Sequence, residues 1–219
     1  MSSNSDAAGF VLAGGQSSRM GRDKALLPFA GRPLVEHALS ILREAGLPAA
    51  IAGATAPAHR YLAFFAPVVD DAEPGLGPLS GICAALGSTS ARHAVFLSVD
   101  QPLLPASLLV YLLHRAHITG LAVTAPSIAG FIQTFPAVID RAALPALDAA
   151  LHEGTGGCFE AFQSAVAGLG QPVGAVAVEL LAQSGQVAHP RGLPPLHWFL
   201  NLNTPSDLRR AKVFSRFIA

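Results

Sequence analysis

Short apolar runs alternate along this chain with stretches in which apolar residues recur every three or four positions. The clearest runs cover residues 10–13 and 94–99, and both have the length and composition of a strand buried on both faces. The clearest helical pattern covers residues 33–45, where Pro33 suits the first turn and Gly46 suits the end. Strands alternating with helices predict an α/β fold with a mostly parallel central sheet.

Weaker patterns complete the expected order of elements. Further strands are predicted at residues 49–52, 67–69, 121–125 and 135–139, with a last strand at 198–203. Further helices are predicted after a glycine-rich turn at residues 74–81, where the helix runs through Leu86, and at residues 104–118, 142–152 and 158–167. A last helix is predicted from Thr204 onward, where Thr204 would cap the helix and Pro205 would be its first residue. Residues 183–197 contain several prolines and are predicted to form an irregular loop.

The composition indicates a packed domain without a strong overall charge. Hydrophobic residues make up 51% of the chain and charged residues 13%, and 14 Lys and Arg residues balance 14 Asp and Glu residues. No overall field would draw nucleic acid or an anionic membrane, so any phosphate binding must be local. No apolar run of about 18 residues is present, and we expect a cytoplasmic protein. A polar tail, residues 1–8, would precede a single domain, residues 9–219.

The first loop has the chemistry of a polyphosphate site. Gly14 and Gly15 follow the first apolar run, where free backbone N–H groups can point at a ligand, and Arg19 and Lys24 come soon after. Bare amides and fixed cations in one short loop suit phosphate groups. The loop is neither a Walker loop nor a Gly-x-Gly-x-x-Gly dinucleotide fingerprint. The alternative is an ordinary strand–loop–helix junction with surface cations.

A second candidate is Asp100, at the end of the strand predicted at 94–99. A carboxylate at the tip of a buried strand is costly unless it is paired or holds a cation. Magnesium uses one or two protein carboxylates together with substrate phosphates, so Asp100 would bind Mg²⁺ beside a triphosphate. The alternative role is an N-cap for the helix that begins near Pro105. Asp71 follows a predicted strand and Asn201 lies toward the carboxyl end of the last one, on the edge of the sheet where open α/β proteins bind ligands.

Three segments in order resemble the nucleotidyltransferases of the molybdenum cofactor guanylyltransferase family. They are Leu-Ala-Gly-Gly with Arg-Met-Gly and Asp-Lys at residues 12–24, Pro-Gly-Leu-Gly-Pro-Leu-Ser-Gly at 74–81, and Asn-Leu-Asn-Thr-Pro at 201–205, joined by Asp100-x-Pro. The resemblance implies a three-layer, Rossmann-like nucleotidyltransferase fold, with a nucleotide-binding half at about residues 9–125 and an acceptor-binding half at about 126–219. It also implies transient contacts with other cofactor-biosynthesis or acceptor proteins.

The resemblance also implies a reaction and a role for each matching residue. GMP would pass from GTP to the terminal phosphate of molybdopterin or its molybdenum-loaded form, with Mg²⁺ as cofactor and Arg19, Lys24 and Asp100 as catalytic residues. The nucleotide would contact Leu12, Ala13, Gly14, Gly15, Arg19, Lys24, Asp71, Gly77, Pro78, Gly81 and Asp100. Asn201 and Asn203 would lie near the metal and the acceptor.

The chain departs from the family pattern at two places. The family often has an Asn after its second strand, where this chain reads Ala-Gly-Ala-Thr at 52–55, and a Gln-Pro-Leu triplet where this chain has Gln-Thr-Phe-Pro at 133–136. Both places concern base or acceptor recognition. The alternatives are therefore a cytidylyltransferase acting on the same cofactor or another small phosphorylated acceptor, and a nucleotide-binding regulator without turnover. His114 and His117 share a helix face, and we interpret them as an exposed or partly packed pair rather than metal ligands.

Overall fold

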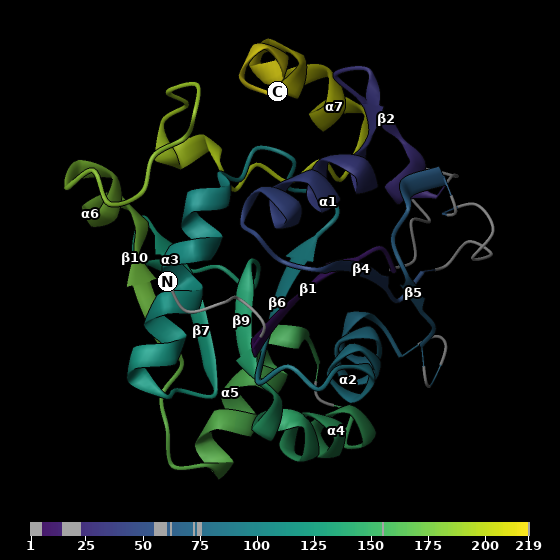
Figure 1. Cartoon of the computed structure of the whole chain (residues 1–219), viewed down its shortest axis with the longest axis vertical. Coiled ribbons are helices and arrows are strands. Elements are labelled where there is room, and N and C mark those ends of the chain that lie inside the picture. Colours follow the sequence, from purple (N-terminus) through teal and green to yellow (C-terminus); the bar gives the residue numbers. More distant parts are fainter. Residues whose placement is uncertain are drawn as a thin grey trace.

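The computed structural model describes residues 6–14, 23–54, 61, 63–71, 73, 76–154 and 156–218. Within these ranges the chain forms a three-layer α/β fold, with helices on both faces of a central sheet (Figure 1). No helix among them is both long and apolar enough to cross a membrane.

In the described part of the chain, eight strands form the central sheet. Their order is β10 (Gly174–Ala177), β7 (Val123–Ile128), β9 (Ala137–Asp140), β6 (His93–Ser98), β1 (Ala7–Leu12), β4 (Ala49–Ala52) and β5 (Val68–Val69), and β8 (Phe131–Ile132) pairs with β7. The strands from β6 to β5 run parallel, as do β7 and β10, whereas β9 is antiparallel to both of its neighbours. A separate hairpin joins β2 (Pro28–Phe29) to β3 (Arg32–Pro33).

The helices divide between the two faces of the sheet (Figure 1). One face carries α1 (Leu34–Glu44), α3 (Ala106–Thr119), α6 (Val178–Gln183) and α7 (Pro205–Ala211). The other carries α2 (Pro78–Ser88), α4 (Leu144–His152) and α5 (Cys158–Gly168). Short 3-10 helices are η2 (Lys24–Leu26), η4 (Arg141–Ala143), η5 (Pro195–His197) and η6 (Lys212–Phe217).

The apolar run of β1 is explained by burial on both faces. Successive side chains of a strand point to opposite sides, so Val11 packs with α1 and α3 while Phe10 and Leu12 pack with the opposite helices. The ring of Phe10 stacks on that of Phe96 in β6, with centroids 5.5 Å apart. This packing fixes β1 beside β6, so that the segments following the two strands emerge together.

Most predicted elements are confirmed, including β1, α1, β4, β6, α5 and the start of α7 at Pro205. The predicted strand at 198–203 is wrong. The segment after η5 is not a strand, because β6 already pairs with β1 and β9 and has no free edge there. The segment is fixed instead by Trp198, whose buried indole N–H donates to the carbonyl of Leu193 over 2.7 Å.

Candidate active site

Lys24 lies at the centre of a polar cluster at the carboxyl end of β6. Its ammonium Nζ is 2.7 Å from Oδ2 of Asp100 and also donates to Oδ1 of Asn203. The side chains of Lys24 and Asp100 are 16% and 13% exposed, so the ion pair is largely shielded from water. The structure thus brings together three predicted site residues from distant parts of the sequence.

Asp100 has a partner for each of its carboxylate oxygens. Ser98, the last residue of β6, donates its hydroxyl to Oδ1, and Lys24 occupies Oδ2. The alternative role of Asp100 as a helix N-cap is wrong, because α3 begins at Ala106 after Pro105, with no side-chain cap. The carboxylate of Asp100 therefore belongs to the polar cluster and does not cap the helix that follows it.

Asn203 is placed by the segment on either side of it. The N–H of Leu202 donates to the carbonyl of Asp100 over 3.0 Å, which fastens this segment beside the end of β6. Thr204 then forms a capping box with Asp207 at the start of α7, as its spacing predicts. Asn203 is thus held between a backbone hydrogen bond and a capped helix.

Three glycines meet beside the ends of β1, β4 and β5. A Cβ atom added to Gly14 would lie 2.1 Å from the carbonyl oxygen of Gly53, so only glycine permits this approach of the two backbones. Gly53 has φ +66°, a conformation that favours glycine, and a Cβ on Gly81 would lie 3.2 Å from its Cα. Asp71 completes the group, with Oδ1 3.1 Å from the same Gly81 position.

The carboxyl group of Asp71 has a buried oxygen atom whose hydrogen-bonding capacity is not used by the described residues. Its Oδ1 is buried and has no hydrogen-bond partner among the described residues. Burial and the neighbouring charge of Asp70 raise the pKa of Asp71. A buried acceptor without a partner is costly, and a bound group that donates a hydrogen bond would remove this cost.

The remaining predicted site residues divide into three groups. Gly77 and Pro78 form the start of α2, where Gly77 has φ 79° and Pro78 is the first helical residue. Leu12 and Ala13 are buried at the end of β1, and Asn201 is exposed without a hydrogen bond to the Lys24 cluster among the described residues. Gly15 and Arg19 lie outside the described residues.

The polar cluster and the glycine group lie at one edge of the sheet. The N–H of Val99 donates to the carbonyl of Leu12 over 3.3 Å, so the segment leading to Asp100 runs beside the one leading to Gly14.

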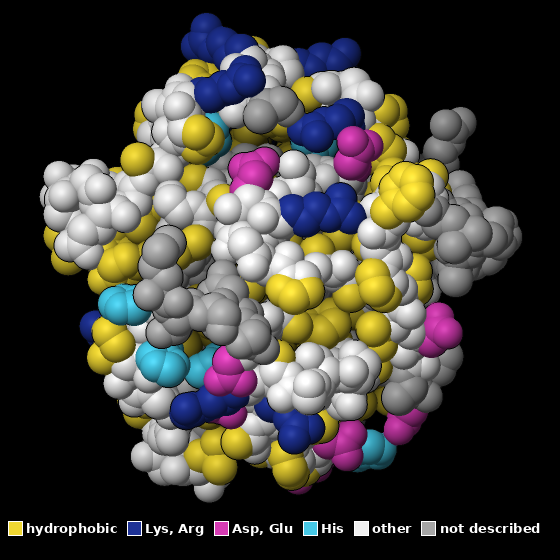
Figure 2. Space-filling view, viewed as in Figure 1, with side chains coloured by type: hydrophobic (Ala, Val, Ile, Leu, Met, Phe, Trp, Pro, Cys, Tyr) yellow, Lys and Arg dark blue, Asp and Glu magenta, His cyan; other side chains and the backbone are white. Residues whose placement is uncertain are grey.

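Lys and Arg side chains gather over the C-terminal elements α7 and η6 (Figure 2). The basic residues of α7 and η6 are Arg209, Arg210, Lys212 and Arg216. The chain is neutral overall, but its positive charge is locally concentrated, which favours anionic ligands there.

Sequence reasoning missed two residues of this region. Ser98 is a polar residue at the last position of a buried strand, and that position was the available signal for its contact with Asp100. Gly53 follows the second predicted strand where the family often has Asn, and it proves to be the residue against which Gly14 and Gly81 pack.

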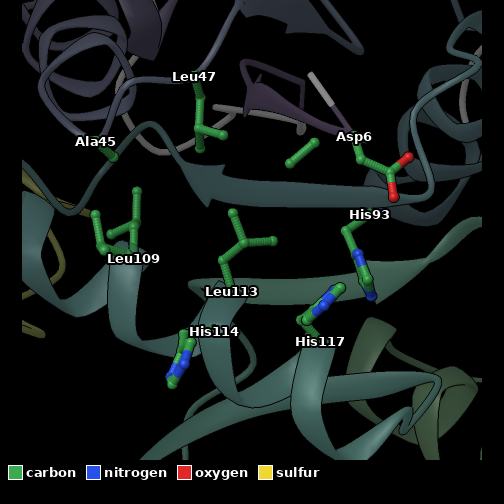
Figure 3. Close-up of a pocket in the computed structure, with 10 residues that line it drawn as sticks. Asp6, Ala45, Leu47, His93, Leu109, Leu113, His114 and His117 are labelled. Atoms are coloured by element: carbon green, nitrogen blue, oxygen red, sulfur yellow. The ribbon is translucent and has the colours of Figure 1, made fainter. Parts of the chain in front are cut away.

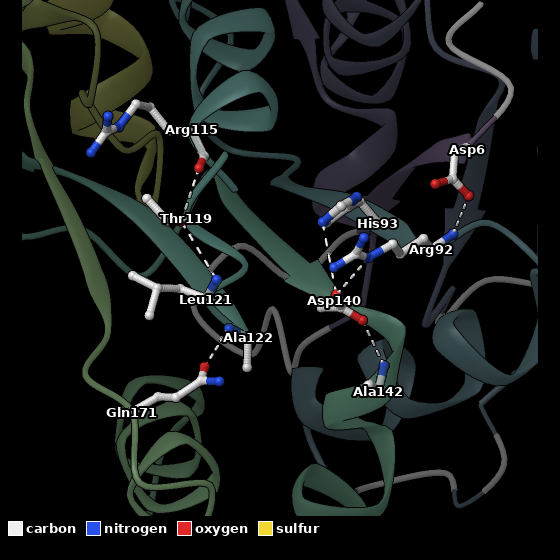
Figure 4. A network of polar contacts seen from close by, with 10 residues as sticks. All are labelled: Asp6, Arg92, His93, Arg115, Thr119, Leu121, Ala122, Asp140, Ala142 and Gln171. Atoms are coloured by element: carbon white, nitrogen blue, oxygen red, sulfur yellow. Dashed lines mark hydrogen bonds and ion pairs between the residues drawn. The ribbon is translucent and has the colours of Figure 1, made fainter. Parts of the chain in front are cut away.

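A cavity of about 500 Å³ lies at the opposite end of the sheet (Figure 3). Its lining includes Leu109 and Leu113 of α3 and the imidazole rings of His93, His114 and His117. None of the described residues of the predicted site lines this cavity. His93 lies at the start of β6, with Nε2 3.9 Å from Oδ2 of Asp140, an oxygen that accepts from Arg92 (Figure 4). His114 and His117 are exposed, and no group of three or more metal-binding side chains is found in the described residues.

The fold and the cluster at the strand ends define the chain as an enzyme of the nucleotidyltransferase class. A sequence model of the MobA-like NTP transferase domain matches residues 9–168, and the chain belongs to this family. It is 34% identical over 213 residues to a molybdenum cofactor guanylyltransferase of Rhodobacter capsulatus, covering 94% of both chains.

Further relatives agree with this assignment. A molybdenum cofactor guanylyltransferase of Xanthomonas euvesicatoria is 44% identical over 106 residues, covering 48% of this chain and 52% of the relative. The crystal structure of molybdopterin-guanine dinucleotide biosynthesis protein A from Archaeoglobus fulgidus superposes with a TM-score of 0.75 at 22% identity. That superposition covers 95% of this chain and 98% of the other, and it supports the fold.

Proposed function

We propose that this chain transfers GMP from GTP to the terminal phosphate of molybdopterin or its molybdenum-loaded form. An oxygen of the acceptor phosphate attacks the α-phosphorus and forms a new P–O bond, while the bond to the β-phosphate oxygen breaks and pyrophosphate leaves. This chemistry depends on positioning and charge neutralisation more than on a proton-transfer residue. The observation that carries the proposal is the largely shielded ammonium of Lys24, held by Asp100 and Asn203 at the strand ends.

Lys24 neutralises the charge that develops on the α-phosphate and the leaving group. Its Nζ already lies in a fixed position before a ligand arrives, so little reorganisation is needed when the reaction occurs. Arg19 and the backbone amides of Gly14 and Gly15 assist with the phosphates. The positive surface over α7 and η6 draws the anionic substrates toward this edge of the sheet.

The nucleoside lies between Leu12–Gly14 and the start of α2 at Gly77–Gly81. Backbone groups of a glycine-rich turn can meet the acceptor and donors of a guanine edge without any side chain. Asp71 would accept a hydrogen bond from the nucleoside through Oδ1, which has no partner among the described residues. A site that hydrogen-bonds one edge of a base rejects a base without that edge, by roughly 1–3 kcal/mol for each group left unpaired. GTP should therefore exceed CTP and ATP in kcat/KM by about tenfold or more.

The residues around Asp100 fit a magnesium ion. Asp100 and Asn203 supply the oxygen donors that Mg²⁺ prefers, and each carboxylate oxygen of Asp100 has a second lone pair beside the one used by Ser98 or Lys24. When bound, Mg²⁺ would neutralise charge on the phosphates. Asn201 and Asn203 belong to the acceptor half, about residues 126–219, where molybdopterin binds. The cytoplasmic location and transient contacts with proteins that deliver or receive the cofactor stay predictions.

The test is incubation of the protein with Mg²⁺, molybdopterin and an equal mixture of GTP, CTP and ATP, followed by mass analysis of the product. The expected product is the guanine dinucleotide, together with pyrophosphate. An excess of the cytosine product would make the chain a cytidylyltransferase. Retained nucleotide binding without any product would make it a binding regulator.

A further inference from the structure

The backbone around Lys24 is held by the residue before it. Asp23 caps η2, because its Oδ1 accepts from the N–H of Ala25 over 3.1 Å and its carbonyl accepts from the N–H of Leu26 over 3.2 Å. Ala25 is buried in the core. The carboxylate of Asp23 thus accepts a hydrogen bond from Ala25, the residue after Lys24, so Asp23 holds the backbone on both sides of Lys24. Asp23 was not among the predicted site residues.

The second oxygen of the Asp23 carboxylate is held from the core. The hydroxyl of Tyr61 donates to Oδ2 over 2.7 Å. Tyr61 is fully buried and belongs to the hydrophobic core that contains α1, and its ring lies 6.4 Å from that of Phe64. A hydrogen bond from a buried tyrosine to a carboxylate is among the stronger kinds, so it fixes Asp23 relative to the core.

A continuous chain of contacts therefore leads from the core to the ammonium group. It runs from Tyr61 to the Asp23 carboxylate, through the η2 backbone to Lys24, and from Nζ to Asp100. Lysine has a long and flexible side chain, so the place where its backbone is anchored decides how far Nζ can reach. A displacement of about 1 Å at a reacting group can lower a rate by about a hundredfold.

We propose that Asp23 and Tyr61 are positioning residues that hold Lys24 with its Nζ against Asp100 and Asn203. Neither residue needs to touch the substrate, because each acts through the backbone of η2. The effect expected on turnover rests on the proposed function, in which Lys24 acts on the α-phosphate. The effect on the position of Lys24 is independent of that function.

The position of Lys24 can be measured without any enzymatic assay. The chain has two lysines, and Lys212 in η6 serves as an internal reference for acylation by acetic anhydride, followed by mass analysis of the labelled peptides. An amine that is held in an ion pair and shielded from water reacts slowly, since its access to the reagent is restricted. Tyr61→Phe and Asp23→Ala should raise labelling of Lys24 relative to Lys212 by about tenfold, the scale of one hydrogen bond to a charged group.

A matched control is available in α3. Tyr111 is the second of the two tyrosines in the chain, lies in α3 and packs partly buried against the hydrophobic core. Tyr111→Phe removes the same hydroxyl group and should leave the labelling ratio and turnover unchanged. Circular dichroism melting of each variant establishes that the labelled protein is folded.

Kinetics separate positioning from simple loss of stability. With the folded enzyme, Tyr61→Phe should lower kcat by about tenfold and Asp23→Ala by about a hundredfold, while the KM for GTP changes by less than about threefold. Asp23→Asn should recover much of the loss, because its amide oxygen can still accept from Ala25. Tyr61→Phe should have little further effect in the Asp23→Ala background, since the hydroxyl then has no carboxylate to hold.

Unchanged Lys24 labelling in folded Tyr61→Phe and Asp23→Ala proteins would overturn the proposal. Raised labelling in both, with an unchanged ratio in Tyr111→Phe, supports it even if the wild-type protein transfers no nucleotide. Raised labelling with normal turnover would leave Asp23 and Tyr61 as positioning residues for Lys24 and would overturn the role of Lys24 in the proposed function.

Discussion

Gly14→Ala tests the close approach of two backbones at the ends of β1 and β4. The new Cβ would lie 2.1 Å from the carbonyl oxygen of Gly53, against a closest normal separation of 3.0 Å, so the backbones must part by at least about 0.9 Å. The hydrogen bond from the N–H of Ala13 to the carbonyl of Ala52 is 3.0 Å long and would be stretched beyond hydrogen-bonding range by a shift of this size.

The magnitude follows from these two effects. Overpacking costs about 1–3 kcal/mol and the loss of a buried hydrogen bond a similar amount, so we expect the free energy of unfolding to fall by about 3 kcal/mol. For a chain of this size that corresponds to a decrease in Tm of roughly 6–12 °C. Thermal melting followed by circular dichroism measures it directly, and GTP binding should weaken as well because Gly14 borders the proposed phosphate site.

Two other glycines of the chain supply controls. Gly87, near the end of α2, has no atom within 4 Å of an added Cβ, so Gly87→Ala should leave Tm unchanged or raise it slightly. Gly81→Ala would place its Cβ 3.1 Å from Oδ1 of Asp71 and should give a smaller decrease than Gly14→Ala. A Gly14→Ala protein that melts within about 1 °C of the wild type would refute the reasoning, because the overlap would then be relieved at almost no cost.

Three further predictions concern charge. Asp100→Asn should keep the fold and lower turnover by about a hundredfold or more, and near-normal turnover under saturating Mg²⁺ would exclude the metal role. Lys24→Ala should lower kcat more than it weakens GTP binding in calorimetry, whereas a raised KM alone would make Lys24 a uniform binding contact. Burial lowers the pKa of His93 below its ordinary value of 6.5, an effect that Asp140 and Asp6 oppose and that Arg92 and His117 reinforce. The unfolded chain therefore binds more protons as the pH falls below about 7, and the free energy of unfolding should decrease toward pH 5. In urea unfolding at several pH values His93→Gln should flatten this decrease, and an unchanged slope would contradict it.

The parts of the fold that depend on local pattern could be predicted from the sequence. The apolar run of β1 and the amphipathic pattern of α1 can each be recognised within a short stretch of consecutive residues, and both elements lie where the pattern predicts them. The run at 198–203 also contains large apolar residues, but whether it becomes a strand depends on a free sheet edge, which β9 removes by pairing with β6. Residues 137–140 carry no sign that they insert antiparallel between β6 and β7.

The same distinction applies to the candidate site. Asp100 and Lys24 stand out because a charge after a buried strand or within a glycine-rich loop needs a chemical reason. The hydrogen bond between Tyr61 and Asp23 joins residues 38 positions apart, and neither local sequence contains a pattern that predicts it. The role of Gly53 was hidden for a similar reason, since its contacts with Gly14 and Gly81 exist only after the strands have paired.

The contact between Lys24 and Asn203 spans 179 residues of sequence. A ribosome makes the chain from its N-terminus, so β1, β4 and β6 can associate well before Asn203 has been synthesised. The central sheet is itself incomplete until β9 has emerged and taken its place between β6 and β7. During synthesis the Lys24 ammonium can therefore bind Asp100 first and Asn203 only after residue 203 has been made. A chain terminated before residue 203 would retain most of the sheet but would lack one of the two groups that hold the cation.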